Sequence, residues 1–509
     1  MPRMHTEGHV PDPREDANPV GRRRLSRRAL LGYAGAGAAA GALGPVLSGA
    51  ALSRATADGP AQGGISVSPA SPQYPALKVL GRKSLRLPDS LPFPDLPAGT
   101  DTMPAIEHVV VLMMENHSFD NFLGVLGRGD GFKLGPDGQP TASNPYADGS
   151  IQHAFHMPTT CQLSGAPGQE WTTSHVAYDN GALDGFVRAS GPVAMGYWTQ
   201  DDLPFTYSLA STFPLADRWF CSLLGQTDPQ RRFLIAGTSG GMTDDIGLPS
   251  QNALLTQTVN GTIFQRFTTY GVDWSNYAAS FPFGATPELY PVNDTALESG
   301  SHRRTFDQFF TDAAAGTLPS FSFLDENFDT QSQENPQNIV VGEAMMAQVV
   351  QALGNGPGWA KTLLVLTYDE HGGYYDHVPP PVALAPDSLP PVVLPGESTY
   401  DGFERYGFRV PGLIVSPYSK RRYVSHTVFD HTSVLALVER KWNLPAMTYR
   451  DANANDLTDL VDLHAMDKSR PIFPALPPLA AAGNTPEALA CSTTGPGTIP
   501  PPGSVTPAP

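Results

Sequence analysis

Two distant segments of the chain each end an apolar run in oxygen-bearing side chains. Glu115 and Asn116 follow the run 106–114, and Asp369 and Glu370 follow the run 362–368. Such runs are typical of strands buried on both faces of a parallel sheet, and chemistry in open α/β sheets lies at the carboxyl ends of the strands. If the two ends meet, three carboxylates and an amide form the oxygen-rich site that a hard divalent cation prefers.

Both segments also have a plainer interpretation. Asn116 or Ser118 can cap a helix over residues 119–123, and Asp369 with Glu370 can belong to a solvated acidic loop. Against the second alternative, adjacent acids at a strand end repel each other unless a cation or a proton lies between them. The residue types alone leave these alternatives open.

A third segment supplies a hydroxyl group. Thr227 follows Gly225 and precedes Asp228 and Pro229, a pattern that predicts a turn leading into a helix. The backbone field at a helix N-terminus favours phosphate, and a nearby cation lowers the pKa of a hydroxyl so that it becomes a nucleophile. The alternative is that Thr227 simply caps the helix.

The elements that position these residues alternate between strands and helices. Residues 363–368 and 411–415 predict strands, whereas the apolar spacing over 340–353 and 432–443 predicts amphipathic helices. This alternation predicts an α/β fold with a mostly parallel central sheet and helices on both faces. Residues 243–318 have little periodicity and are predicted to form an insertion near the site.

The N-terminal residues 1–57 are similar to a twin-arginine export signal. Arg27 and Arg28 precede a run of Ala, Gly and Leu, and small residues follow at 55–57. The alternative, a membrane anchor, is disfavoured because the run is rich in Gly and Ala and is interrupted by Pro45. We therefore expect export by the twin-arginine machinery to the periplasm, the cell wall or the medium, with no stable membrane span after cleavage.

The composition predicts three further regions and excludes one class of partner. A Pro/Gly-rich leader is expected over 58–104, a catalytic domain over 105–467 and a Pro/Ala-rich tail over 468–509. The hydrophobic content of 40% allows a sizeable core, and the net charge of −17 disfavours nucleic acid as a partner. Cys161 and Cys221 can pair in an exported protein or remain thiols.

Several motifs together resemble one family. Residues 114–124, which begin Met-Glu-Asn-His-Ser-Phe-Asp, are similar to a signature of the bacterial phosphoesterase family that includes non-haemolytic phospholipases C and related acid phosphatases. Residues 367–381 resemble its second signature, and residues 225–231 resemble the turn that bears its Thr or Ser nucleophile. Further blocks match in the same order at 171–186, 318–323, 409–417 and 430–433.

This resemblance implies an alkaline-phosphatase-like α/β fold and phosphoric-ester hydrolysis through a phosphorylated enzyme. It implies Thr227 as the nucleophile and a divalent metal ion of unspecified identity as cofactor. The implied metal ligands are Glu115, Asn116, Asp369 and Glu370, and the candidates for the phosphate shell are His175, His371, His377 and His431. We expect a phospholipase C acting on phospholipid; the alternative of the same family is an acid phosphatase acting on phosphomonoesters.

Two positions depart from the family pattern. Asn335 and Gln169 stand where the family often has His. Asn and Gln can bond to phosphate, but they cannot donate a proton as a general acid. A weakened phosphate-binding surface protein is therefore the alternative of another class.

Overall fold

A computed structural model describes residues 64–162, 167–245, 258–278, 286–290, 302–328, 330–335, 337–478 and 498–505. All of them belong to one compact unit that spans Pro60–Pro509. The predicted export signal lies outside the described residues and stays a prediction. Within the described ranges, no helix has the length and apolar character needed to cross a membrane.

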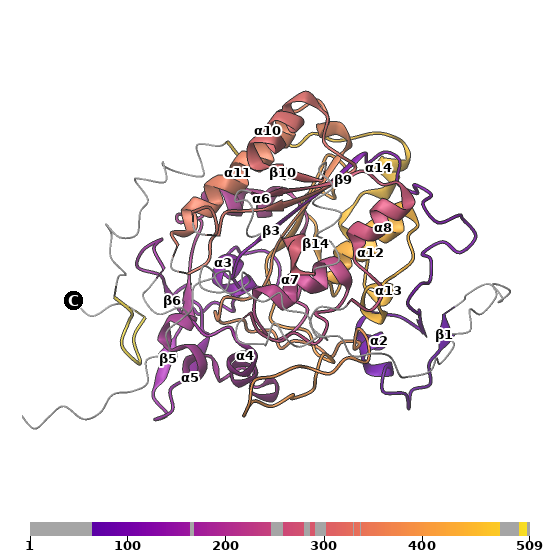
Figure 1. Cartoon of the computed structure of the whole chain (residues 1–509). Helices are drawn as coiled ribbons and strands as arrows, with labels where there is room; N and C mark the ends of the chain where they lie inside the picture. Colours follow the sequence, from indigo (N-terminus) through magenta and orange to yellow (C-terminus); the bar gives the residue numbers. More distant parts are fainter. Residues whose placement is uncertain are drawn as a thin grey trace, which may run out of the picture. The chain divides into compact units, whose positions relative to one another are not determined.

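An eight-stranded sheet occupies the centre of this unit (Figure 1). Its strands run in the order β10 (Arg303–Thr305), β9 (Trp274–Ala278), β11 (Phe321–Asp325), β3 (His108–Met114), β12 (Thr362–Tyr368), β13 (Gly412–Val415), β8 (Leu215–Ala216) and β14 (Val424–Ser425). β13 runs antiparallel to both of its neighbours, and the other adjacent pairs are parallel. The predicted α/β fold with a mostly parallel sheet is confirmed.

The central strands are buried because their side chains are apolar on both faces. Every residue of β12 is buried, as is every residue of β3 after His108. In the register of the sheet, Met114 pairs with Tyr368 and Leu112 pairs with Leu324. The carboxyl ends of β11, β3 and β12 therefore come level at one edge of the sheet.

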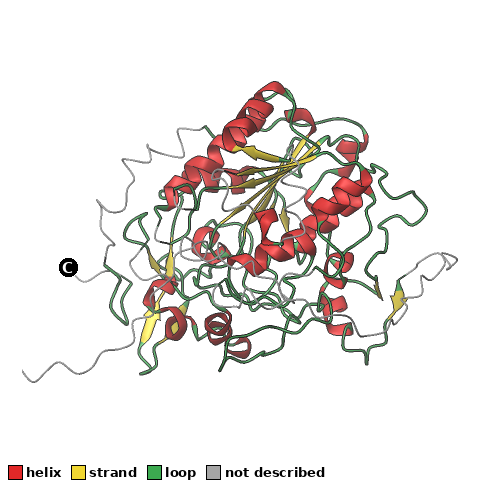
Figure 2. Ribbon diagram, viewed as in Figure 1, coloured by secondary structure: helices red, strands yellow, loops and turns green. Residues whose placement is uncertain are grey.

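Helices cover both faces of the sheet (Figure 2). One set comprises α6 (Pro204–Thr212), α10 (Phe306–Ala315) and α11 (Ile339–Asn355); the other comprises α7 (Thr227–Ala236), α8 (Ile263–Tyr270), α12 (Thr432–Trp442) and α13 (Tyr449–Asn453). The helices predicted over 340–353 and 432–443 correspond to α11 and α12. α12 ends where Asn443 adopts a left-handed backbone conformation.

Shorter elements complete the unit. The helices are α2 (Tyr74–Val79), α3 (Phe119–Leu123), α4 (Trp171–Tyr178), α5 (Phe186–Ser190) and α14 (Leu463–Asp467). The strand pairs are β1 (Ile65–Ser66) with β2 (Ser84–Leu85), β4 (Ser143–Pro145) with β5 (Ile151–His153), and β6 (Phe155–His156) with β7 (Gly196–Tyr197).

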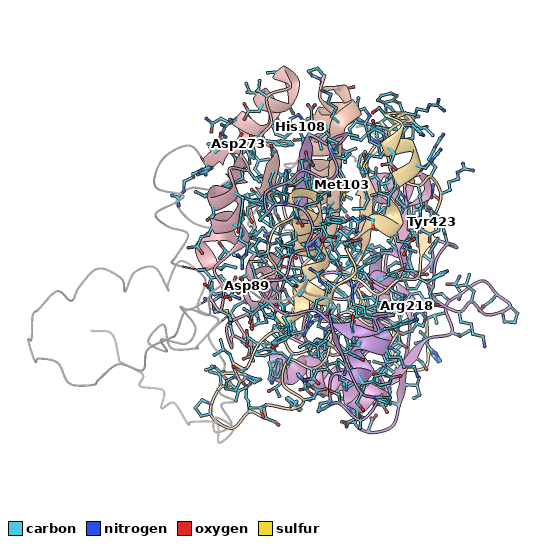
Figure 3. The ribbon with its side chains drawn as sticks, turned by 90° about the vertical axis from the view of Figure 1, so that its right-hand side faces the viewer. Asp89, Met103, His108, Arg218, Asp273 and Tyr423 are labelled. Carbon is cyan, nitrogen blue, oxygen red and sulfur yellow. The ribbon has the colours of Figure 1, made fainter. Side chains whose placement is uncertain are left out.

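The segment that precedes β3 is docked on the domain. Met103 is buried in the main core, and Asp89 forms an ion pair with Arg266 at 3.2 Å. Arg82 donates to the backbone carbonyl groups of Asn453 and Ala454. Figure 3 shows the side chains of this region, with Asp89 and Met103 labelled.

The described part of the predicted insertion differs from the expectation. Residues 258–278 and 302–318 contribute α8, α10 and the two strands at one edge of the sheet, β9 and β10, to the central layers. β9 carries Ser275 and Asn276 and is nevertheless buried throughout. Asn276 can be buried because it donates to the carboxylate of Asp325. Buried polar side chains of this kind interrupt the apolar alternation by which a strand is recognised in a sequence.

Candidate active site

Three adjacent parallel strands end in acidic side chains at the same edge of the sheet. The structure brings the two predicted segments together after β3 and β12, and it adds a third pair at the end of β11. The carboxylates of this acidic cluster are at most 2% exposed; they belong to Glu115, Asp325, Glu326, Asp369 and Glu370. The third pair was not predicted, although β11 shows the same signal of an apolar run ending in two acids.

Asn116 faces the acidic cluster rather than capping a helix. Ser118 is the residue that caps α3, since its hydroxyl accepts a hydrogen bond from the backbone of Asn121. Asn116 has a left-handed backbone (φ 68°), and its N–H donates to Asp369 Oδ1 at 2.9 Å. One end of its amide lies 3.2 Å from Asp369 Oδ1 and 2.7 Å from Glu370 Oε1, and this end donates to both when it is the nitrogen.

The glycine turn after Glu370 makes this approach possible. Gly372 has φ +65°, and a Cβ there would lie 1.8 Å from the backbone oxygen of Asn116. Its N–H donates to Glu370 Oε2 at 2.7 Å. Only a residue without a side chain allows the two segments to pack so closely.

Thr227 lies beside this group of side chains. It is the first residue of α7, the preceding Gln226 is the N-cap residue, and Thr227 is 2% exposed. Its Oγ1 lies 3.4 Å from Asn116 Oδ1. The hydroxyl of Thr227 therefore faces Asn116, one of the predicted metal ligands. Thr227 is not the N-cap residue of α7.

Arg231 is one turn further along α7 and inserts its guanidinium among the carboxylates. It lies 3.1 Å from Glu115, 3.3 Å from Asp325, 3.4 Å from Asp369 and 3.6 Å from Glu326. Arg231 had no predicted role. Its spacing from Thr227 was the available signal, because residues four apart lie on the same face of a helix.

Burial dominates the electrostatics of the acidic cluster. It raises the pKa of Glu115 and Glu370 well above the usual range, and the charge of Asp369 adds to both shifts. Burial also raises the pKa of Asp369, against the opposing effect of Arg231, and brings the pKa of Glu326 to about 8. Five carboxylates around one guanidinium thus require protons or a further cation.

The donor set suits a divalent cation on the β12 side of the acidic cluster. No group of three His, Cys, Asp or Glu side chains in the described part of the chain is arranged to hold a metal ion, and Arg231 already binds several of the acids. The amide of Asn116 converges with Asp369 and Glu370, however. With its oxygen turned to them, it completes a set of hard oxygen donors. Glu115 is adjacent to this set and also forms an ion pair with Arg231.

Two of the predicted histidines adjoin this group. Nδ1 of His371 lies 2.9 Å from Glu370 Oε2, and burial lowers the pKa of His371 to about 3. His431 precedes α12; its Nε2 lies 2.6 Å from the backbone oxygen of Asp369, and burial lowers its pKa to about 4. Both imidazoles are therefore neutral at physiological pH, and Nδ1 of His431 has no hydrogen-bond partner in the described part of the chain.

The other two histidines have partners elsewhere. His175 on α4 bonds through Nδ1 to the carbonyl of Trp171 at 2.7 Å, and its ring stacks on Tyr400 at 3.9 Å. His377 bonds through Nδ1 to Asp120 at 2.6 Å. The described contacts of these two rings do not include the acidic cluster, so the phosphate-shell role of His175 and His377 stays a prediction.

Asn335 and Gln169, the two departures from the family pattern, have contacts of different kinds. Asn335 Nδ2 donates to the hydroxyl of Tyr374 at 3.0 Å, which places Asn335 against the second signature. Gln169 contacts Glu170 and Ser174 through its backbone.

The two core cysteines are not paired with each other. Cys221 is a buried free thiol, and Cys161 is disulfide-bonded.

Comparisons with known proteins agree with this geometry. The sequence model of the Phosphoesterase family matches residues 106–445. The chain is 30% identical to Phospholipase C A of Mycobacterium tuberculosis, with 74% of this chain and 82% of that protein covered. It is also 30% identical to the Non-hemolytic phospholipase C of Pseudomonas aeruginosa, with 74% and 60% covered.

A solved protein of the alkaline phosphatase superfamily from Vibrio parahaemolyticus is 12% identical, covers 66% of this chain and 76% of its own, and has a TM-score of 0.32. An overlap of that size carries no argument. The family match and the relatives confirm the resemblance found in the motifs: the chain belongs to the Phosphoesterase family and is a hydrolase of phosphoric ester bonds.

Proposed function

We propose that this protein is a metal-dependent phospholipase C that acts through a phosphorylated Thr227. The observation that carries the proposal is the position of the Thr227 hydroxyl, at the N-terminus of α7 and 3.4 Å from Asn116. The hydroxyl there meets the positive end of a helix and the oxygen-rich group of Asn116, Asp369 and Glu370. The helix end favours a phosphoryl group directly, and the oxygen-rich group would do so when it holds a divalent cation.

The reaction has two displacements at phosphorus. Thr227 Oγ1 bonds to phosphorus as the bond from phosphorus to the alcohol oxygen breaks, and the net result is transfer of the Thr227 proton to the alcohol. Water then bonds to the same phosphorus as the bond from phosphorus to Oγ1 breaks, and a proton of that water returns to Oγ1. A divalent cation held by Asn116, Asp369 and Glu370, with Glu115 beside them, lowers the pKa of the hydroxyl and neutralises phosphoryl charge when it is bound.

The chain's own residues do the positioning. The Asn116 N–H donates to the Asp369 carboxylate at 2.9 Å, which fixes the position of these two residues relative to each other beside Thr227. Neutral His371 and His431 add donors or acceptors at the wall of the site without adding charge. Phosphoryl transfer needs this combination of fixed geometry and charge neutralisation.

The names of the relatives support a phospholipid substrate. Cleavage would release diacylglycerol and a phosphorylated head group. A phosphomonoester remains the alternative substrate, since the same two displacements serve both esters.

One assay decides the substrate class and the metal dependence. Phosphatidylcholine and a chromogenic phosphomonoester are supplied side by side, each with and without a chelator. We expect faster release of phosphocholine than of the chromophore, and loss of both activities with chelator that added divalent metal restores. Faster monoester turnover would favour the acid phosphatase, and full activity in chelator would overturn the metal dependence.

We further propose export by the twin-arginine route. Arg27 and Arg28 in the N-terminal segment motivate it, and the disulfide at Cys161 supports an oxidising destination.

A further inference from the structure

We propose that the guanidinium of Arg231 is the built-in second cation of the acidic cluster. It lies between the ends of β3 and β11, so that the protein takes a single divalent ion, on the side of β12. The inference deepens the proposed function and rests on it, because the divalent ion is the one assigned to Asn116, Asp369 and Glu370.

The hydrogen bonds of Arg231 use the whole guanidinium. Nη1 donates to Asp325 Oδ1 at 3.3 Å and to Thr286 Oγ1 at 3.1 Å. Nη2 donates to Glu115 Oε1 at 3.1 Å and to the carbonyl of Met113 at 3.3 Å. Nε donates to Asp369 Oδ2 at 3.4 Å. One side chain therefore ties together the ends of β11, β3 and β12.

The β11 side of the acidic cluster is organised around this guanidinium. Asp325 also accepts hydrogen bonds from the Thr286 N–H at 2.9 Å, the Thr286 hydroxyl at 2.5 Å and Asn276 Nδ2 at 2.7 Å. Among the described residues, neither carboxylate oxygen of Glu326 has a hydrogen-bond partner, and its Oε1 lies 3.6 Å from Arg231 Nη2. Arg231 is thus the charge that Glu326 faces.

Charge balance explains why a cation is needed there. Five buried carboxylates converge, and buried charges without a partner are strongly destabilising. A guanidinium stays protonated at any physiological pH and satisfies several carboxylates at fixed angles. A bound ion can dissociate, whereas Arg231 supplies its charge permanently.

Arg231 also acts as a positioning residue for the nucleophile. It follows Thr227 by four residues on α7, so both side chains point to the same edge of the sheet. Its anchoring to three strand ends fixes the rotation of α7 about its axis. The direction of the Thr227 hydroxyl is fixed with it.

The test counts bound Mn²⁺ per chain by equilibrium dialysis with metal analysis. The wild type, Arg231→Met and Arg232→Met are compared as full mature chains. Arg232 is the matched control, because it is buried on the same helix but donates to the carbonyl groups of Ser239 and Leu289. We expect one Mn²⁺ in the wild type and in Arg232→Met, and two in Arg231→Met. Turnover should fall at least 100-fold in Arg231→Met and less than fivefold in Arg232→Met.

Each contrary outcome identifies what has failed. Two ions in the wild type would overturn the inference and leave the proposed function standing. No ion in an active wild type would overturn the metal dependence itself. One ion in folded Arg231→Met would also overturn the inference.

Arg231→Lys provides the decisive count if the methionine variant does not fold. Lysine keeps the charge, so one ion is expected, with turnover intermediate between the wild type and a Thr227→Val variant. Two ions in Arg231→Lys, or turnover no higher than that of Thr227→Val, would contradict the role of Arg231.

Discussion

Asp369→Asn isolates the charge of one carboxylate from its structural role. Asp369 Oδ1 accepts hydrogen bonds from the N–H groups of Asn116 at 2.9 Å and Glu370 at 2.7 Å. An asparagine oxygen can keep both bonds, and the lost interaction with Arg231 is a long one at 3.4 Å. We therefore expect the free energy of unfolding to change by only about 1 kcal/mol.

Asp369→Ala would confound the same experiment. It leaves two buried N–H groups without acceptors, at about 1–3 kcal/mol each, or roughly 2–6 kcal/mol in total. Loss of activity in that variant would mix damage to the fold with loss of a ligand. The pair of variants separates the two effects when urea unfolding is measured for both.

The predicted effect of Asp369→Asn on catalysis is large. If the carboxylate helps to hold the cation and balances its charge, about 3–5 kcal/mol of transition-state stabilisation is lost, which corresponds to about 10²- to 10⁴-fold in turnover. The assay is phosphatidylcholine hydrolysis at saturating substrate, with bound metal measured on the same sample. Turnover within threefold of wild type, with metal content unchanged, would refute the reasoning.

Three further predictions concern the surroundings of the site. Gly372→Ala should abolish activity and destabilise the fold, since its Cβ would lie 1.8 Å from the Asn116 oxygen; unchanged turnover and urea midpoint would contradict the close approach of the two signatures. The hydrogen bond to Asp120 raises the pKa of His377 against the effect of burial. The stabilising charge is therefore present below about pH 6.5 and is lost as pH rises through the folded pKa. His377→Gln should cost about 1 kcal/mol at pH 5.5 and less at pH 9, and an equal cost at both pH values would argue against a charged His377. Arg27→Lys combined with Arg28→Lys should retain the protein in the cytoplasm, as cell fractionation would show; normal export of this variant would count against the twin-arginine signal.

The sequence predicted the parts of the fold in which each element buries apolar side chains in a regular pattern. β3, β12, α11 and α12 were all predicted to within two residues at each end. β9 and β10 were not predicted, because β9 buries polar residues that bond to neighbouring strands and β10 has only three residues. Such strands are stabilised by their tertiary partners rather than by local pattern.

The candidate site divides in the same way. Residues that follow directly on a strong strand, such as Glu115 and Asp369, could be located from the chain alone. Arg231 and Glu326 were not assigned: helix spacing and a strand end offered a signal for them, but their roles become visible only through neighbours on other elements. The phosphate-shell role of His175, which a motif match suggested, stays a prediction, because its observed contacts are with Trp171 and Tyr400.

Trapping of a covalent phosphoenzyme tests the central claim most directly. Wild type, Thr227→Ser and Thr227→Val are mixed with a phosphorus-labelled phosphatidylcholine, quenched in acid within milliseconds and examined for protein-bound label. Because Ser retains the attacking oxygen and Val keeps only the shape of Thr, we expect label on the first two proteins and none on Thr227→Val, with the label mapping to residue 227. Label of equal amount on Thr227→Val, or turnover of that variant within tenfold of wild type, would show that Thr227 is not the nucleophile.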